Sequence, residues 1–170
     1  MRASTLLIAA IAAGFALPAL AQIATPTRKA GYWDQTMVMA GNHPTTMKTQ
    51  FCTDANVEKS ISAFGQGASQ SMCSKNVIRK TLTGYAFEST CKVGNGTSVS
   101  SGTATGDFNT GYTVNMVSKT TPPPAPGMGE TKMTITAKWV GPCPAGKKPG
   151  DMVMPGGMTV NIANVGKARR

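Results

Sequence analysis

Methionine is the residue type in this sequence with the most distinctive chemistry. The chain has 170 residues and 11 methionines, and ten of these lie after residue 21. Thioether sulfur is a soft ligand that selects Cu(I), and it still binds where thiols are consumed as disulfides. Met152, Met154 and Met158 lie close together near the C-terminus, so they are candidate metal ligands, with His43 as a remote fourth. A Cu(I)-binding protein is therefore one alternative function, beside the simpler interpretation that these methionines are incidental.

Residues suited to acid–base catalysis are scarce. The sequence has one histidine, and 7 Asp plus Glu against 17 Lys plus Arg. His43 lies in the turn-like segment Asn42–His43–Pro44, and no G-x-S-x-G nucleophile motif is present. Asp34 and Asp151 are far apart in the sequence, and each fits a turn or a strand surface. We therefore predict no catalytic residue, no cofactor and no enzyme activity, and keep a hydrolase as the second alternative.

The N-terminus has the pattern of a secretory signal peptide. Arg2 precedes an apolar run from Leu6 to Leu17, and Ala19 and Ala21 form an A-x-A cleavage site. The run is shorter than the ~20 residues that span a bilayer. We therefore expect cleavage after Ala21 and export, with no transmembrane segment. Loss of Arg2 lowers the formal net charge from +10 to +9.

All four cysteines, Cys52, Cys73, Cys91 and Cys143, follow the signal peptide. An even count in an exported chain indicates two disulfides, and the lack of a C-x-x-C pair argues against zinc. Three connectivities are open. A hairpin that turns near Thr83–Gly84 brings Cys91 close to residue 76, so Cys73 reaches Cys91 if its strand begins irregularly. Cys52 then pairs with Cys143, and each bridge stabilises the fold by roughly 3 kcal/mol or more.

A period of two dominates the rest of the chain. Met133, Ile135, Ala137 and Trp139 alternate with Lys and Thr, which is typical of a strand with one dry face. Similar segments occur at residues 31–40, 45–53, 76–82, 85–92, 97–105 and 112–117, separated by Gly- and Pro-containing turns. The predicted fold is mainly β: a curled antiparallel meander of about seven strands, half-barrel or barrel-like, with one short α-helix and disulfides.

Three segments depart from this alternation. Asp54 is a good N-cap, and Val57, Ile61 and Phe64 follow at helical spacing. Residues 120–129 include Pro-Pro-Pro-Ala-Pro and predict an extended loop, because proline cannot pair as a central strand. Residues 151–170 have little periodicity. The predicted organisation is a signal peptide at 1–21, a single disulfide-stapled β domain at 28–150, and a flexible Met/Gly-rich basic tail at 151–170.

Several short motifs occur together with the four cysteines. They are Gly-Tyr-Trp-Asp at 31–34, Phe-Cys-Thr-Asp at 51–54, Lys-Trp-Val-Gly-Pro-Cys-Pro at 138–144 and Lys-Pro-Gly-Asp-Met at 148–152. In this combination the chain resembles the domain of unknown function 3617 family, small exported proteins of Gram-negative bacteria, over about residues 28–152. The resemblance implies a periplasmic location and disulfide use, and it implies no activity. The proline loop and the Met-rich tail depart from the family pattern.

A curled sheet could enclose a small apolar ligand or could have a filled core. The residues expected inside it are Trp33, Met37, Phe87, Tyr112, Ile135 and Trp139. The positive charge could attract an anionic component of the cell envelope. The basic residues are spread along the chain without interleaved aromatic residues, so we expect no nucleic-acid partner. We therefore expect an exported, non-enzymatic envelope protein or small-ligand-binding protein.

Overall fold

The computed structural model describes residues 26–41, 44–61, 72–125, 127 and 129–162. The expected signal peptide, His43, Phe64 and residues 163–170 lie outside the described residues. Within the described part, no helix is long and apolar enough to cross a membrane.

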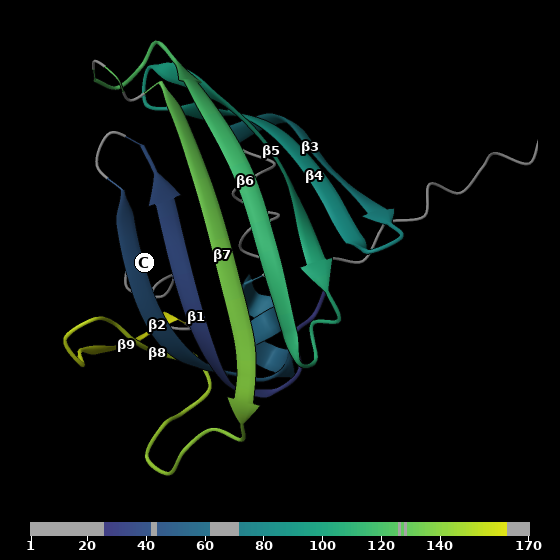
Figure 1. Ribbon diagram of the computed structural model, residues 1–170, viewed down its shortest axis with the longest axis vertical. Coiled ribbons are helices and arrows are strands. Elements are labelled where there is room, and N and C mark those ends of the chain that lie inside the picture. The colour runs from purple at the N-terminus through teal and green to yellow at the C-terminus, as the bar shows by residue number, and fades with distance from the viewer. Residues whose placement is uncertain (1–25, 42–43, 62–71, 126, 128, 163–170) are drawn as a thin grey trace, which may run out of the picture.

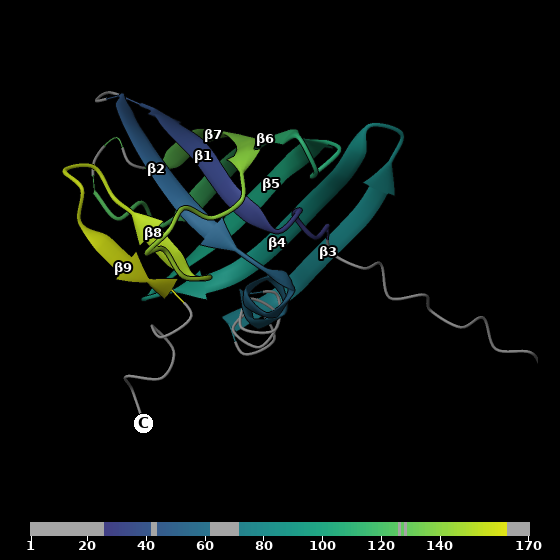
Figure 2. The same ribbon diagram turned by 90° about the horizontal axis from the view of Figure 1, so that it is seen from below.

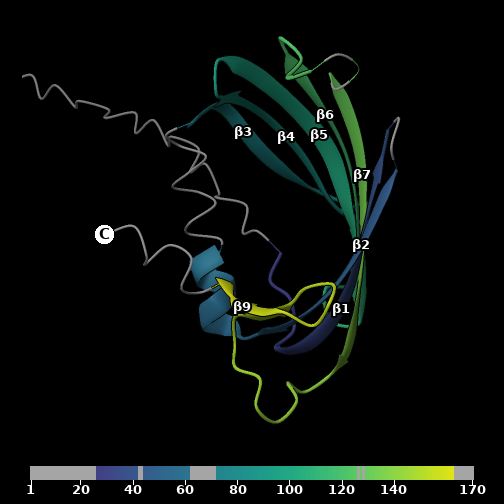
Figure 3. The same ribbon diagram turned by 90° about the vertical axis from the view of Figure 1, so that its left-hand side faces the viewer.

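In the described part of the chain, nine strands form one antiparallel sheet that curls without closing into a barrel (Figures 1 and 3). The strand order is β3-β4-β5-β6-β7-β1-β2-β8-β9, so β3 and β9 are its edges. The strands are β1 (Gly31–Ala40), β2 (Thr45–Thr53), β3 (Cys73–Thr81), β4 (Gly84–Val93), β5 (Gly96–Gly106), β6 (Gly111–Thr121), β7 (Glu130–Gly141), β8 (Asp151–Val153) and β9 (Thr159–Asn161).

The prediction of a mainly β fold is confirmed. It succeeded because the alternation of apolar and polar side chains along a strand is a local signal. All seven predicted strands are present, and the first two coincide with β1 and β2. The loop after β6 contains the proline run, as expected, and a hydrogen bond from Thr120 N to Gly129 O (2.8 Å) closes it.

The helix begins after Asp54 and covers residues 55–61 of the described part. Asp54 Oδ1 accepts hydrogen bonds from the backbone N–H groups of Asn56 (3.0 Å) and Val57 (2.8 Å), so Asp54 is the predicted N-cap. Val57 is buried, whereas Ile61 is 38% exposed. The helix lies inside the curve of the sheet, near its lower end (Figures 2 and 3).

Two disulfides fasten the sheet. Cys73 bridges to Cys91 across β3 and β4, where the register shifts at the start of β3. This shift is the irregularity that the pairing required. Cys52 at the end of β2 bridges to Cys143 just after β7. The second bridge closes a sequence separation of 91 residues and the first a separation of 18.

Residues 151–162 differ from the flexible tail expected there, because they add β8 and β9 to the sheet. Gly150 N donates to Cys52 O (2.9 Å), which brings the chain back alongside β2. Asp151 then accepts hydrogen bonds from Lys148 N and from Asn161 Nδ2, both at 2.8 Å. These bonds lower the pKa of Asp151. Strands of three residues are too short for alternation to reveal them, and they form here because the disulfide and Asp151 hold the segment against β2.

The two disulfides should contribute unequally to stability. In the chain-entropy model a bridge that closes a long loop restricts the unfolded chain more than one that closes a short loop. We expect a Cys52→Ala/Cys143→Ala variant to lose about 4 to 5 kcal/mol of unfolding free energy, and Cys73→Ala/Cys91→Ala about 3 kcal/mol. Chemical denaturation followed by circular dichroism measures both values. A larger loss in the second variant would contradict the expectation.

Candidate functional site

The concave face of the sheet has a packed lower half. Trp33, Phe51 and Ala137 are buried there and form the hydrophobic core. Three partly buried residues pack against this core from neighbouring strands, namely Tyr112, Trp139 and Met152. The register explains the cluster, because Trp33 lies opposite both Phe51 and Trp139, and Ala137 lies opposite Tyr112.

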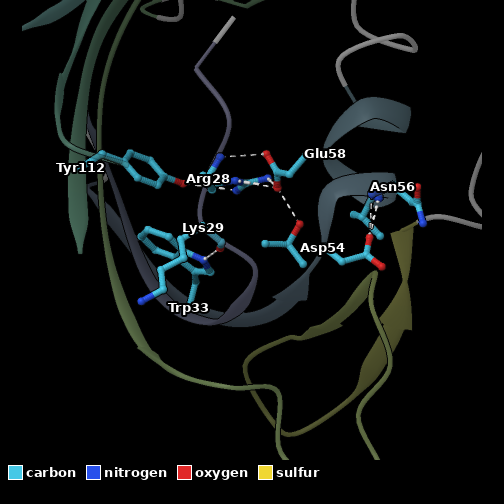
Figure 4. A network of polar contacts seen from close by, with 9 residues as sticks. Arg28, Lys29, Trp33, Asp54, Asn56, Glu58 and Tyr112 are labelled. Atoms are coloured by element: carbon cyan, nitrogen blue, oxygen red, sulfur yellow. Dashed lines mark hydrogen bonds and ion pairs between the residues drawn. The ribbon is translucent and has the colours of Figure 1, made fainter. Parts of the chain in front are cut away.

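A buried ion pair joins the segment before β1 to the helix (Figure 4). Arg28 Nη2 lies 2.8 Å from Glu58 Oε1, and Arg28 Nε donates to the same oxygen at 3.0 Å. Thr53 Oγ1 also donates to Glu58 Oε1, at 2.5 Å. The two charged side chains are only 18% and 6% exposed, respectively. The polar atoms of these two side chains therefore bond to each other instead of to water.

Two aromatic residues hold the guanidinium of Arg28 in place. Its Nη1 donates to the Tyr112 hydroxyl at 3.3 Å, and its central carbon lies 4.5 Å from the centroid of the Phe51 ring. Burial alone lowers the pKa of Arg28, but interactions with Tyr112 and Glu58 outweigh it, so the pKa is raised above its ordinary value. The guanidinium stays charged, and the carboxylate of Glu58 keeps its partner.

Lys29 and Ala30, which follow Arg28, are held in place by two tryptophans. Trp33 Nε1 donates to Lys29 O (2.9 Å), and Trp139 Nε1 donates to Ala30 O (3.1 Å). Lys29 Nζ lies 3.6 Å from the Trp139 ring centroid, which is cation–π geometry. Gly31 has φ of 134°, and a Cβ there would come within 2.4 Å of Trp139 Nε1. The Gly-x-Trp start of β1 is therefore a packing requirement.

The loop before β6 supports the same core. Asp107 Oδ1 accepts hydrogen bonds from the backbone N–H groups of Asn109 (2.8 Å), Thr110 (2.7 Å) and Gly111 (3.2 Å). Hydrogen bonds from Thr110 and its neighbours hold the pKa of Asp107 well below its usual range. The loop presents Phe108, whose ring stacks on Tyr112 with centroids 5.3 Å apart.

The upper half of the concave face carries a different surface, which we call the apolar band. It consists of two adjoining rows of cross-strand neighbours that run from β2 to β3. The first row is Met47, Met37, Ile135, Val114, Ala104 and Tyr85, and the second is Met39, Met133, Met116, Gly102, Phe87 and Ile78. Most of these residues are half-buried. Among the described elements, the helix lies over the lower part of the face (Figure 3).

Gly102 makes room for an aromatic side chain within the band. Phe87 is its cross-strand neighbour on β4, and a Cβ at Gly102 would come within 2.5 Å of Phe87 Cζ. The ring therefore covers the backbone of β5.

The six residues expected inside the sheet all lie on the concave face, but the structure divides them. Trp33, Tyr112 and Trp139 belong to the packed lower half. Met37, Phe87 and Ile135 belong to the half-buried apolar band. The lower half of the face is therefore a filled core, and the upper half is the part where an apolar ligand would be expected.

The convex face carries mainly polar side chains, together with exposed valines such as Val99 and Val117. Asp34 Oδ1 accepts from Gln50 Nε2 (2.7 Å), and Tyr32 Oη donates to Gln50 Oε1 (3.1 Å). Partial burial and the nearby Asp34 raise the pKa of Tyr32. Open grooves of about 370 and 360 Å³ run between rows of this face, and most of their walls are Ser, Thr, Asn, Gln, Asp and Lys side chains. The hydrogen-bond partner of Asp34 is thus the amide of Gln50 and not a second carboxylate.

The three methionines near the C-terminus differ in their surroundings. Met152 packs against the core, whereas Met158 is 63% exposed at the turn between β8 and β9. Met154 meets Met158 through its backbone, since Met154 N donates to Met158 O at 2.8 Å. In the described part of the chain, no three His, Cys, Asp or Glu residues are grouped to hold a metal ion.

Arg28 and Glu58 were not among the residues singled out from the sequence. Glu58 stands in the first turn of the helix, where a carboxylate is common on a solvated surface. Its partner is 30 residues away and precedes the first strand. The sequence held one weak signal. Glu58 follows Val57 directly and so lies at the margin of the narrow apolar stripe of the helix.

Removal of the Glu58 charge should destabilise the fold strongly. In Glu58→Gln the guanidinium of Arg28 keeps its shape-matched partner but loses the opposite charge. Because the pair is buried, we expect a loss of about 3 kcal/mol in unfolding free energy. Glu130→Gln is the matched control, since its pair with Lys132 has side chains 53% and 66% exposed and should cost under about 1 kcal/mol. Urea denaturation compares them, and equal losses would contradict this interpretation.

A comparison with protein-family models confirms the family resemblance inferred from the sequence motifs. The family described as "Protein of unknown function (DUF3617)" matches residues 28–143, from Arg28 of the buried ion pair to Cys143 of the long-range disulfide. No curated protein and no solved structure matches the chain. The chain belongs to the DUF3617 family.

Proposed function

We propose that this is an exported periplasmic protein, without enzyme activity, that binds an elongated apolar molecule along the apolar band. One observation carries the proposal. Two adjoining rows of half-buried apolar side chains cross the concave face of a sheet that does not close. Soluble proteins seldom leave a continuous apolar surface partly open to water unless it binds something.

The dimensions of the apolar band favour a chain-like ligand. It crosses seven strands, and neighbouring strands lie about 4.8 Å apart, so it is roughly 29 Å long. It is two residues wide, which corresponds to roughly 7 Å between rows. A bilayer about 30 Å thick holds two layers of acyl chains, so one such chain is shorter than the band. The flexible thioethers of Met37, Met39, Met47, Met116 and Met133 suit a ligand without a fixed shape.

Polar groups border the band where a ligand head group would lie. Lys80 is cross-strand to Tyr85 at the β3 end of the first row. A row of small polar residues adjoins the second row and includes Ser118 and its cross-strand partner Ser100. Ser118 shares one hydrogen bond with Ser100 and another with Ser98 in the next row, each at 2.9 Å. One cation and several hydroxyls beside an apolar track favour an acyl chain with an acidic head.

The N-terminal sequence and the disulfides support export. The first 21 residues have the pattern of a cleaved signal peptide. All four cysteines are bridged, which fits an oxidising compartment. The scattered carboxylates and the absence of a nucleophile motif support a binding role in place of catalysis.

A polar substitution in the band should weaken binding of an apolar probe. We expect the neutral fluorophore N-phenyl-1-naphthylamine to bind saturably, and palmitate to displace it. Ile135→Gln places an amide among the apolar rows without a partner and should raise the dissociation constant about tenfold, equivalent to about 1.4 kcal/mol. Met37→Gln, in the same row, should have a similar effect.

The control lies on the opposite face of the sheet. Val99 on β5 is 52% exposed and belongs to the convex face, so Val99→Gln should leave probe binding unchanged. Thermal unfolding of each variant establishes that it is folded. Equal probe binding by all three variants would exclude the band as the site, and dimerisation that alone accounts for the fluorescence would identify a second copy as the occupant.

One experiment tests both where the protein is located and which molecule it binds in the cell. The full chain is expressed in a Gram-negative host, purified from the periplasmic fraction without detergent, and analysed by native and denaturing mass spectrometry. We expect an N-terminus at Gln22 and a co-purifying apolar molecule that Ile135→Gln loses. A protein that stays in the cytoplasm with residues 1–21 attached would contradict the export proposal.

A further inference from the structure

Methionines on the long central strands all lie on one face of the sheet. The described part of the chain has five such residues on β1, β2, β6 and β7, and we call them the methionine cluster: Met37, Met39, Met47, Met116 and Met133. The register puts each of them in one of the two rows of the apolar band. Each is half-buried, so its sulfur is neither sealed in a core nor fully in water.

Three members of the cluster are direct neighbours across adjacent strands. Met133 on β7 lies opposite Met39 on β1 and opposite Met116 on β6. Directly opposed residues have Cβ atoms about 5 Å apart. An unbranched methionine side chain with three rotatable bonds can swing its sulfur across that distance. Three thioethers can therefore converge on one point above Met133, and the pair Met37–Met47 lies one row away.

The other donors that compete for metals are removed or dispersed. All four cysteines are in disulfides, so no thiolate is present in the oxidised protein. In the described residues, no three His, Cys, Asp or Glu side chains come together as a metal site. The two rows contain one basic side chain at their margin, Lys80, which is at the far β3 end, away from Met39 and Met47. Among the described residues, the side chains directly opposite Met133 are thus both thioethers.

We propose that Met39, Met116 and Met133 bind a soft monovalent metal ion, Cu(I) or its redox-inert analogue Ag(I). Thioether sulfur prefers such ions, whereas Zn²⁺ and Mg²⁺ require nitrogen, thiolate or oxygen ligands, and the two described side chains opposite Met133 offer sulfur. The site replaces the one expected at Met152, Met154 and Met158, because Met152 is packed in the core and Met158 is exposed at a turn. Binding involves no change of oxidation state and no covalent step.

Silver titration tests the site without reductant. Calorimetry of the oxidised, full-length protein should detect one Ag(I) ion, and the ε-methyl NMR signals of Met39, Met116 and Met133 should shift together. Met39→Leu/Met116→Leu/Met133→Leu should weaken Ag(I) binding at least tenfold. The matched control, Met154→Leu/Met158→Leu, removes two thioethers elsewhere and should leave the affinity unchanged. Cu(I) added anaerobically should then show only sulfur in its first coordination shell by X-ray absorption.

Ile135→Gln separates this site from the proposed function. It keeps all three thioethers, so it should retain Ag(I) binding while it loses N-phenyl-1-naphthylamine, and thermal unfolding establishes that the triple variant is folded. Absence of Ag(I) binding by the unsubstituted protein overturns the proposal. Loss of binding in the Met154→Leu/Met158→Leu control, with retention in the triple variant, overturns it by assigning the metal to the C-terminal methionines.

Discussion

The buried ion pair between Arg28 and Glu58 is the contact on which the rest of the structure depends. A curled, unclosed sheet with one apolar face needs something to cover that face. Here the segment before β1 and the helix after β2 cover its lower half, and Arg28 and Glu58 fasten the two to each other. Thr53, Phe51 and Tyr112 then attach this closure to β2 and β6. Such a pair is costly to desolvate, so its geometry has to be held by all of these neighbours together.

The closure divides one face of the sheet between two tasks. Below it, Trp33 and Phe51 exclude water and supply a small core, and the Cys52–Cys143 bridge compensates for the limited size of that core. Above it, the same strands extend beyond the level of the described helix (Figure 3). The transition happens within single strands: β1 passes from buried Trp33 to half-buried Met37 in four residues. Stability and binding can therefore be varied separately by substitutions at different heights along one strand.

Local patterns in the sequence predicted the strands and the helix start well, because alternation and the Asp54 N-cap act over a few residues. They also indicated which residues share a face. They could not show how much of the face is covered, since that depends on where the segment at Arg28 and the helix come to lie. The burial of Glu58 and the addition of β8 and β9 depend likewise on contacts between distant segments, such as Gly150 with Cys52. The candidate site was therefore predicted as a set of residues but not as two separate halves.

The unclosed sheet leaves the backbone of β3 at an edge, where strands from other molecules can in principle add. This strand bears Lys75, Arg79 and Lys80 within six residues, all exposed, and Glu88 of β4 forms ion pairs with the first two. Two copies that met along this edge would bring like charges together and force long side chains to desolvate. At the other edge, β9 is only three residues long. The same openness that exposes the concave face is thus kept from becoming a template for fibril growth.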